Sequence, residues 1–273
     1  NAPHPSTGLP KASGYDLIVI GAGPAGLAAA AIGARAGLST LVVDENPTPG
    51  GQIYRAATTS PLKDQGLLGP EYARGAELVA EARASGAEII SGATVWSLDR
   101  DRLVGISKGG ASRLVTARRV IIATGALERP FPIPGWTLPG VLTVGAGQTV
   151  LKSSGLVPQG RLAIAGQGPL VWLYAAQILR AGGTIEAILD TSERGNLVAA
   201  LPHALDFLLS PYALKGLKLM REVKAKVRVI KGVTKLDARG DGKLAELAYE
   251  AGGRPGVLTL DVLRLHQGVV PHV

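Results

Sequence analysis

Three glycines near the amino terminus have the spacing of a dinucleotide-binding turn. The letters GAGPAG place Gly21, Gly23 and Gly26 in the pattern G-x-G-x-x-G. The first glycine would allow a tight turn, the second would let the backbone approach a diphosphate, and the third would let a helix pack closely on a strand. Pro24 and Ala25 stand where that helix would begin, and its first amides attract phosphate oxygens. The pattern therefore indicates the binding of an adenine dinucleotide.

The segments on either side of this turn occur in the order that such a site needs. YDLIVI before it is typical of a buried parallel strand, and LAAAAIGARAG after it reads as a helix ending near Gly37. STLVVD then predicts a second strand that ends at Asp44, followed by Glu45. A carboxylate at this place can accept hydrogen bonds from ribose hydroxyls. A glycine turn without a ligand is the alternative, but the order of the elements favours a nucleotide site.

The composition suits repeated units of strand and helix. The 273 residues are enough for about two domains of ordinary size. Hydrophobic residues make up 46% of the chain and aromatic residues only 4%, so Ala, Val, Leu and Ile must fill the interior around many of the 37 glycines. These features predict an α/β fold with tight turns.

Cysteine content and charge exclude several classes of function. No cysteine is present, which excludes thiolate metal sites and redox dithiols within these residues, and the four histidines lack metal-ligand spacing. The formal net charge of +8 favours anionic partners. The basic run at 215–231 lacks interleaved aromatic residues and nucleic-acid motifs, so we expect a solvated helix face, or alternatively a docking face for an acidic partner. Neither a membrane span nor a signal peptide is visible, which favours a cytoplasmic protein.

The turn and its flanks occur a second time. RLAIA, GQGPL, VWLYAAQILRAGG and TIEAILD repeat the order of strand, turn, helix and strand. The candidate residues of this second site are Gly166, Gly168, Pro169 and Asp190. Val171 replaces the third glycine, and its branched side chain should shift the helix and disturb a diphosphate. NAD(P), another adenine nucleotide and a vestigial fold without a ligand are the alternatives, and Arg194 nearby would suit a 2′-phosphate.

The first half resembles the flavoproteins with two dinucleotide-binding domains. The resemblance lies in PGGQIYR, GATVWSLD and RVIIATG, which follow the turn in the superfamily's order. It implies FAD as cofactor, with further contacts from Gly50, Gly51, Gln52, Arg55, Val95, Ala123, Thr124 and Gly125. Val95 stands where the backbone commonly touches adenine, whereas Arg55 could equally be a surface residue. An exposed loop or an ordinary buried strand would explain each stretch alone, but their common order favours FAD.

A closer resemblance is to the FAD subunits of heteromeric amino-acid dehydrogenases. These include opine oxidase, hydrogen cyanide synthase, D-hydroxyproline dehydrogenase and dye-linked proline dehydrogenase, and the block from PGWTLPGV to LKSSG is a fairly specific match. The resemblance implies that a partner subunit carries the amine-oxidising flavin, while this chain holds FAD and passes electrons onward. Some members add an iron–sulfur segment or subunit. His272 departs from the family, which commonly has Asn there. Two alternatives remain: a self-contained NAD(P)H-dependent flavin reductase, and a non-catalytic scaffold that binds an adenine nucleotide.

The repeat and the resemblance together predict two tandem Rossmann-like, three-layer domains. DVLRLHQGVVP is the counterpart of RVIIATG, and in the superfamily the chain then returns to the flavin domain. We therefore expect the flavin domain to lack its return segment here and the native protein to continue past Val273. The expected segments are a flexible leader at 1–13, the FAD-binding domain at 14–130, a crossover linker and helix at 131–160, an NAD(P)-binding-like domain at 161–262 and the start of the return at 263–273.

Overall fold

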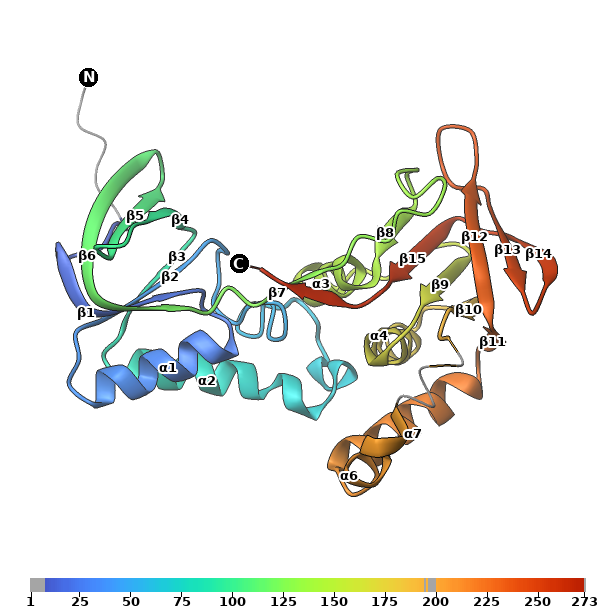
Figure 1. The fold of residues 1–273 in the computed structure, drawn as a ribbon, viewed down its shortest axis with the longest axis horizontal. Helices are drawn as coiled ribbons and strands as arrows, with labels where there is room; N and C mark the ends of the chain where they lie inside the picture. The colour runs from blue at the N-terminus through green and yellow to red at the C-terminus, as the bar shows by residue number, and fades with distance from the viewer. Residues whose placement is uncertain (1–7, 194, 196–199, 273) are drawn as a thin grey trace. The chain divides into compact units, whose positions relative to one another are not determined.

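The computed structural model describes residues 8–193, 195 and 200–272, which alternate between strands and helices as an α/β fold (Figure 1). The chain divides into two compact units. Unit 1 comprises the described residues up to Ala126, together with Lys152–Ser154 and the residues from Pro271. Unit 2 comprises Leu127–Leu151 and Gly155–Val270. The α/β class predicted from the sequence is confirmed.

Unit 1 is built on a six-stranded sheet. Its strands are β1 (Gly14–Ile20), β2 (Thr40–Asp44), β3 (Glu88–Ser91), β4 (Thr94–Leu98), β5 (Leu103–Lys108) and β6 (Ala111–Ile122). They are hydrogen-bonded in the order β3-β2-β1-β6-β5-β4. β3, β2, β1 and the second part of β6 run parallel, whereas β4, β5 and the first part of β6 form an antiparallel meander.

Helices cover one face of this sheet and the curled meander covers the other (Figure 1). The helices are α1 (Pro24–Arg35) and α2 (Arg74–Ala84), with the short 3-10 helices η1 (Gln65–Leu68) and η2 (Pro70–Tyr72) before α2. Along β1, Leu17 and Val19 pack with Leu27 of α1, while Ile18 packs with Val104 of β5. This alternation is that of a strand buried on both faces. A run of four alanines and a proline at its first position favour α1.

Unit 2 is built on a five-stranded parallel sheet in the order β11-β10-β9-β15-β8. These strands are β8 (Val141–Thr143), β9 (Leu162–Gly166), β10 (Ala187–Asp190), β11 (Arg228–Lys231) and β15 (Val262–His266). A separate antiparallel sheet contains β12 (Val233–Arg239), β13 (Glu246–Ala251) and β14 (Arg254–Thr259). Its Leu236 and Leu247 pack with Ala163 and Leu263 of the parallel sheet. Among the described residues, the order of β11, β10, β9 and β15 thus repeats that of β3, β2, β1 and β6.

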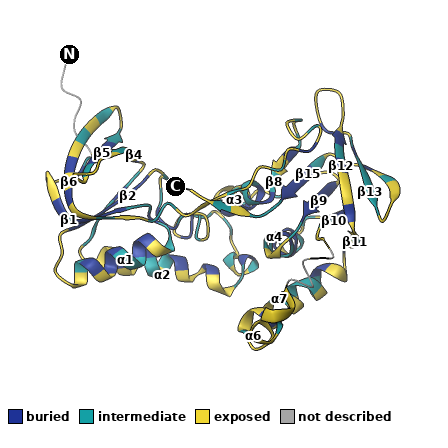
Figure 2. Cartoon of the chain, viewed as in Figure 1, coloured by how far each residue is buried: buried dark blue, intermediate teal, exposed yellow. Residues whose placement is uncertain are grey.

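The helices of unit 2 include α4, which follows the second glycine turn. In the described part of the unit they are α3 (Val144–Ser154, whose last three residues belong to unit 1), α4 (Pro169–Arg180), η3 (Leu201–His203), α6 (Ala204–Leu208) and α7 (Pro211–Lys224). α7 packs on α4. Figure 2 shows that the strands are mostly buried, whereas α6 and much of α7 are exposed. The short strands β7 (Ala126–Glu128) and β16 (Val269–Pro271) pair as a two-stranded sheet.

One predicted strand begins later than the sequence suggests. KLAELAYE reads as a strand from Lys243, but β13 begins at Glu246. The amide of Leu244 donates to the carbonyl of Pro139, and the amide of Ala245 donates to that of Arg239, which closes a turn before the strand. In the described part of the chain, no helix is long and apolar enough to cross a membrane.

Candidate functional site

The first glycine turn follows β1 and enters α1. A Cβ atom on Gly21, which has φ of +104°, would lie 2.4 Å from the carbonyl oxygen of Ala123. A Cβ on Gly26 would lie 1.9 Å from the carbonyl oxygen of Gly21. Both positions therefore need glycine because of the protein's own packing. Gly23 differs, since a Cβ there would have Gly51 Cα at 3.9 Å as its nearest neighbour. A glycine with free space in front of it suits a backbone that a ligand approaches closely.

The amino end of α1 has polar groups available for a ligand. Pro24 is the first helical residue, and the amide groups of Ala25 and Gly26 precede the first intrahelical donor, Leu27, which bonds to the carbonyl of Gly23. No side chain caps this end of α1, and its first turn contains no acidic residue. The helix dipole and these amides together favour an anion.

Asp44 ties the end of β2 to the glycine turn. Its residue is 7% exposed, and its Oδ2 accepts a hydrogen bond from the amide of Ala22 at 2.5 Å. Its Oδ1 accepts from the amide of Asn46 at 2.8 Å and from the side-chain nitrogen of the same residue at 2.9 Å. Since each carboxylate oxygen accepts about two hydrogen bonds, Oδ2 keeps capacity for a hydroxyl. The neighbouring Glu45 is exposed.

The Gly-Gly-Gln stretch folds against the same turn. The amide of Gly50 donates to the carbonyl of Ala22 at 2.8 Å. Gly50 and Gly51 have φ of +130° and +61°, and a Cβ on Gly51 would lie 2.8 Å from the Cα of Gly23. Gln52, which follows, is exposed. The stretch thus forms a second wall beside the amino end of α1, made largely of backbone.

A buried lysine donates hydrogen bonds to the backbone of the loop that follows Gly51. Lys152 is 4% exposed and its Nζ donates to the carbonyls of Gln52 at 3.2 Å and Ile53 at 2.9 Å. Burial, and after it the positive charge of Arg55, lowers the pKa of the Lys152 ammonium to about 8. Nζ also lies 5.8 Å from the centroid of the Tyr72 ring.

Arg55 is hydrogen-bonded through both its side chain and its backbone, and its side chain has a buried donor without a partner among the described residues. Its Nη1 donates to the side-chain oxygen of Asn46, and its carbonyl accepts from the hydroxyl of Tyr72. Its buried Nε has no hydrogen-bond partner in the described part of the chain. A buried guanidinium donor without a partner suits a ligand that offers an acceptor. The side chain of Arg55 is half-buried and hydrogen-bonded to Asn46, and its role at a cofactor stays a prediction.

The remaining residues expected at FAD lie along the same edge of the sheet. Ala123 donates its amide to the carbonyl of Ile20 at 2.8 Å, directly beside the glycine turn. The hydroxyl of Thr124 donates to the carbonyl of His272, and the amide of His272 donates to the carbonyl of Gly125 at 3.0 Å.

Val95 is connected to the site through the residues that precede β4. It lies half-buried on β4, two residues after Ala93, whose amide donates to the backbone carbonyl of Asp44 at 3.0 Å. The structure thus brings the turn, Asp44, the glycine loop and the end of β6 into direct contact. Val95 is connected to them through the start of β4. Asn46 and Lys152 complete this site and were not expected from the sequence.

The second glycine turn, in unit 2, follows a different backbone path. Gly166 has φ of +149° and a Cβ there would lie 1.9 Å from the carbonyl oxygen of His266. Gly168 has φ of +92°, whereas Gly23 at the equivalent place has φ of −73°. Val171, which stands at the position of Gly26 in the repeat, is 2% exposed. The backbone of the second turn therefore differs from that of the first at the glycine before the helix.

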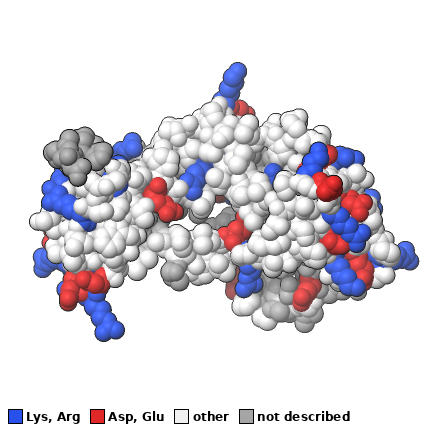
Figure 3. Space-filling model, turned by 90° about the horizontal axis from the view of Figure 1, so that it is seen from above, with Lys and Arg blue, Asp and Glu red and all other residues white. Residues whose placement is uncertain are grey.

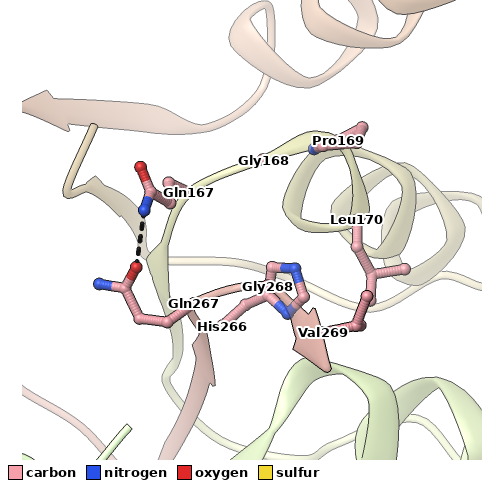
Figure 4. A pocket seen from close by; sticks show the side chains of 8 residues that line it. All are labelled: Gln167, Gly168, Pro169, Leu170, His266, Gln267, Gly268 and Val269. Carbon is pink, nitrogen blue, oxygen red and sulfur yellow. Dashed lines mark hydrogen bonds between the residues drawn. The ribbon is translucent and has the colours of Figure 1, made fainter. Parts of the chain in front are cut away.

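A pocket of about 370 Å³ lies at this second turn (Figure 4). It is lined by Gln167, Gly168, Pro169, Leu170, His266, Gln267, Gly268 and Val269. Gln167 and Gln267 bond to each other at 2.9 Å on one side, as Figure 4 shows. Asp190 ends β10 half-buried and accepts from the amide of Ser192 at 2.9 Å. Arg194 lies outside the described residues.

One pair of residues at the second site could not be expected from the sequence motifs. His266 is buried against Glu128, which comes from the other end of the unit's sequence. A signal was present, because aligning RVIIATG with VLRLHQG places His266 at the position of Ala123. Among the described residues, no three His, Cys, Asp or Glu side chains gather where they could share a metal ion.

Comparisons with known proteins agree with this architecture. The model of a family described as "Pyridine nucleotide-disulphide oxidoreductase" matches residues 15–272. An opine oxidase subunit of Agrobacterium tumefaciens (strain Ach5) is 43% identical over 265 residues, which cover 94% of this chain and 53% of that relative. The HcnB subunit of hydrogen cyanide synthase from Pseudomonas aeruginosa is 32% identical over 246 residues, which cover 87% of this chain and 52% of that relative.

A solved structure extends the comparison to the fold. Thioredoxin reductase of T. acidophilum matches with a TM-score of 0.67 at 20% identity, covering 96% of this chain and 79% of that one. At this identity the match shows the fold alone. The chain spans about half the length of the curated relatives it matches.

Proposed function

The chain belongs to the pyridine nucleotide-disulphide oxidoreductase family, and from this premise we propose that it is the FAD-containing subunit of a heteromeric amino-acid dehydrogenase. The amino acid would be of the opine, hydroxyproline, proline or glycine type. In this role the chain relays electrons that a partner flavin subunit takes from the substrate. The resemblance to such subunits is supported by relatives that are named as subunits of opine oxidase and hydrogen cyanide synthase.

The observation that carries the cofactor is the open space in front of Gly23. Protein packing requires glycine at Gly21 and Gly26 but not at Gly23, where the nearest atom would lie 3.9 Å from a Cβ. The free amides of α1 and the unpartnered Nε of Arg55 are further donors in unit 1. These features fit the diphosphate and the other acceptors of FAD.

Each residue of unit 1 has a distinct part in this proposal. The first turn of α1 and Gly23 would bind the diphosphate, and Asp44 would accept a ribose hydroxyl through Oδ2. Gly51 would let the loop backbone lie close to the cofactor, and Lys152 would hold that loop in place through the carbonyl of Gln52. The flavin supplies the electron-accepting chemistry when it is bound, and the protein's part is to position it.

The second site would bind NAD(P) or another adenine nucleotide. Its pocket at the start of α4 and the carboxylate of Asp190 support a nucleotide in unit 2. Val171 and the altered turn at Gly168 argue against a dinucleotide bound as in unit 1. This is consistent with a chain that receives electrons from a partner rather than from NADH.

A partner flavoprotein subunit would need a surface on this chain. The face formed by α6 and α7, which we call the α6–α7 face, exposes seven large apolar side chains: Leu205, Phe207, Leu208, Leu209, Tyr212, Leu214 and Leu217. Lys215, Lys218 and Arg221 are interleaved with them on α7. Figure 3 looks from the side away from α6 and α7 as Figure 1 draws them, and there Lys and Arg lie among Asp and Glu. Exposed apolar groups among cations suit a protein partner with an acidic rim.

The proposal also includes an iron–sulfur segment or subunit. These residues contain no cysteine, so thiolate ligands for a cluster would have to come from elsewhere. We expect the whole complex to be located in the cytoplasm.

The test is an absorbance spectrum of the complex co-purified with its partner chains, followed by anaerobic addition of NADH. We expect a flavin spectrum, about one FAD per copy of this chain, and no bleaching by NADH. Bleaching would favour a self-contained NAD(P)H-dependent flavin reductase. A colourless chain that releases only an adenine nucleotide on denaturation would favour a scaffold role and overturn the proposal.

A further inference from the structure

Three neighbouring strands in the parallel sheet of unit 2 end side by side. Gly166, the last residue of β9, is paired with Asp190 of β10 on one side and with His266 of β15 on the other. The residue that follows each strand therefore leaves the sheet at the same edge. These three residues are Gln167 after β9, Thr191 after β10 and Gln267 after β15. In open α/β sheets, ligands bind in the crevice outside this edge.

The side chain of Gln267 connects the ends of these three strands. Its Oε1 accepts a hydrogen bond from Nε2 of Gln167 at 2.9 Å, and its Nε2 donates to Oγ1 of Thr191 at 3.3 Å. Figure 4 shows the side chains of Gln167 and Gln267 pointing toward one another. Because β9 lies between β15 and β10, the amide group of Gln267 lies across the carboxyl end of β9. We call these two hydrogen bonds the Gln267 bridge.

The residues of the Gln267 bridge are held in place by their surroundings. All three are half-buried. The amide group of Gln267 uses its oxygen as an acceptor and its nitrogen as a donor, so the two bonds together select one orientation of the group. The backbone amide of Gln167 donates to the carbonyl of His266 at 3.1 Å. That of Thr191 donates to the carbonyl of Gly166, also at 3.1 Å, so the strands hold both ends of the bridge.

The first repeat has different residues at the positions of the bridge. Aligning the two repeats places Ala22 at the position of Gln167 and Thr124 at that of Gln267. Ala22 has no side-chain donor, and the hydroxyl of Thr124 donates to a backbone carbonyl. The backbone amide of Ala22 donates to the carboxylate of Asp44, whereas that of Gln167 donates to a backbone carbonyl. In unit 1 the turn is thus joined to the acid that would bind a ribose, and no side-chain amide from these positions lies between them.

We propose that Gln267 determines the ligand specificity of unit 2 by excluding an extended dinucleotide such as NADH. A dinucleotide reaches from the glycine turn to the acid that ends the second strand, here Asp190. The Gln267 bridge runs between the same two places, because it joins Gln167 in the turn to Thr191 beside Asp190. A dinucleotide could bind only after both hydrogen bonds are broken. The inference rests on the proposed nucleotide binding of unit 2, and it gives a structural reason why NADH should not reduce this chain.

NADH binding to the full chain in the presence of saturating FAD tests the proposal. Equilibrium dialysis measures the affinity without depending on flavin reduction. The double variant Gln167→Ala/Gln267→Thr has the residues of unit 1 at both positions and lacks the bridge. We expect it to bind NADH at least about tenfold more tightly than the unaltered chain does. Equal affinities, or no detectable binding to either protein, would overturn the proposal.

Two further variants locate the effect. Gln159→Ala replaces an exposed glutamine of unit 2 and is the matched control, which should bind NADH as the unaltered chain does. Adding Asp190→Asn to the double variant should reverse the gain in affinity, because the carboxylate at the end of the second strand would accept the ribose hydroxyls. A gain that survives Asp190→Asn would place NADH outside this site and contradict the proposal.

The bridge can also be measured in the unaltered chain. In a ¹⁵N-labelled sample, the side-chain amide of Gln267 should exchange hydrogen with water about tenfold or more slowly than that of the exposed Gln159. Equal exchange rates would show that the bridge is open in solution and would overturn the proposal, even if the double variant failed to fold. FAD content, measured on the same samples, reports on unit 1 separately. A chain that takes up no FAD would contradict the proposed function and leave these results unaffected.

Discussion

Gly51 lies directly against Gly23, although 27 residues separate them in the sequence. A Cβ carbon on Gly51 would be 2.8 Å from the Cα of Gly23, which is closer than carbon atoms approach without strain. The loop and the dinucleotide turn are therefore in contact through backbone alone. This contact brings two glycine motifs together at the proposed FAD site.

Replacing Gly51 by alanine should weaken FAD binding in addition to lowering stability, since Gly51 combines a positive φ of +61° with a close contact to Gly23. The added methyl group would push the loop away from Gly23, so we expect FAD affinity to fall by about tenfold or more. Gly37→Ala is the matched control, because Gly37 also has a positive φ, of +82°, but a Cβ there meets nothing within 4 Å. The Gly37→Ala variant should lose about 1 kcal/mol of unfolding free energy and should still bind FAD. The flavin-to-protein ratio and thermal unfolding measure both effects, and FAD loss in both variants would contradict this account.

The sequence was most informative where function depends on local order. Residues 14 to 44 carry strand, turn, helix, strand and acid within one stretch, and the structure has β1, α1 and β2 in that order. The pairing of Gly51 with Gly23 could be expected only through the family resemblance. No periodicity connects these two loops.

The contacts that the sequence did not predict join distant positions. Lys152 and Gln52 are 100 residues apart, and Glu128 and His266 are 138 apart. Single polar residues in apolar surroundings give no pattern from which such pairs can be read. Their burial, once seen, makes them informative, since buried charges need partners.

Asp44→Asn should weaken FAD binding by about tenfold or more. The amide loses the charge and one acceptor, so it can no longer hold the amide of Ala22 and a ribose hydroxyl equally well. Asp190→Asn, at the equivalent strand end in unit 2, should leave FAD binding unchanged. Reconstitution of the flavin-free chain with FAD measures both constants. Equal losses in the two variants would place the ribose elsewhere.

The buried ammonium of Lys152 should make stability depend on alkaline pH. Its pKa falls from 10.5 when unfolded to about 8 when folded, so between these values the unfolded chain binds more protons. The free energy of unfolding should therefore rise with pH across this window, by about 3 kcal/mol in total. Below pH 8 the Lys152 ammonium is charged in both the folded and the unfolded chain. Its burial therefore destabilises the fold by a constant amount in that pH range.

Comparison with Lys152→Met isolates this effect from other titrating groups. The difference in unfolding free energy between the unaltered chain and the variant should increase in favour of the unaltered chain from about pH 8 to 10.5. Denaturant unfolding at several pH values provides the measurement. Parallel stability curves for the two proteins would show that Lys152 keeps its charge in the fold.

The α6–α7 face should be required for assembly but not for folding. Leu214 is 77% exposed, so Leu214→Glu should change the stability of the chain by less than about 0.5 kcal/mol. The new carboxylate would be repelled by the acidic residues of the partner, and the apolar contact of Leu214 would be lost. The complex should therefore dissociate at concentrations at which the unaltered complex stays intact. Ile32→Glu is the matched control, since Ile32 is an apolar residue of α1 that is 68% exposed in unit 1. Analytical ultracentrifugation of the co-purified complex distinguishes the two variants, and an intact complex with Leu214→Glu would move the partner to another surface.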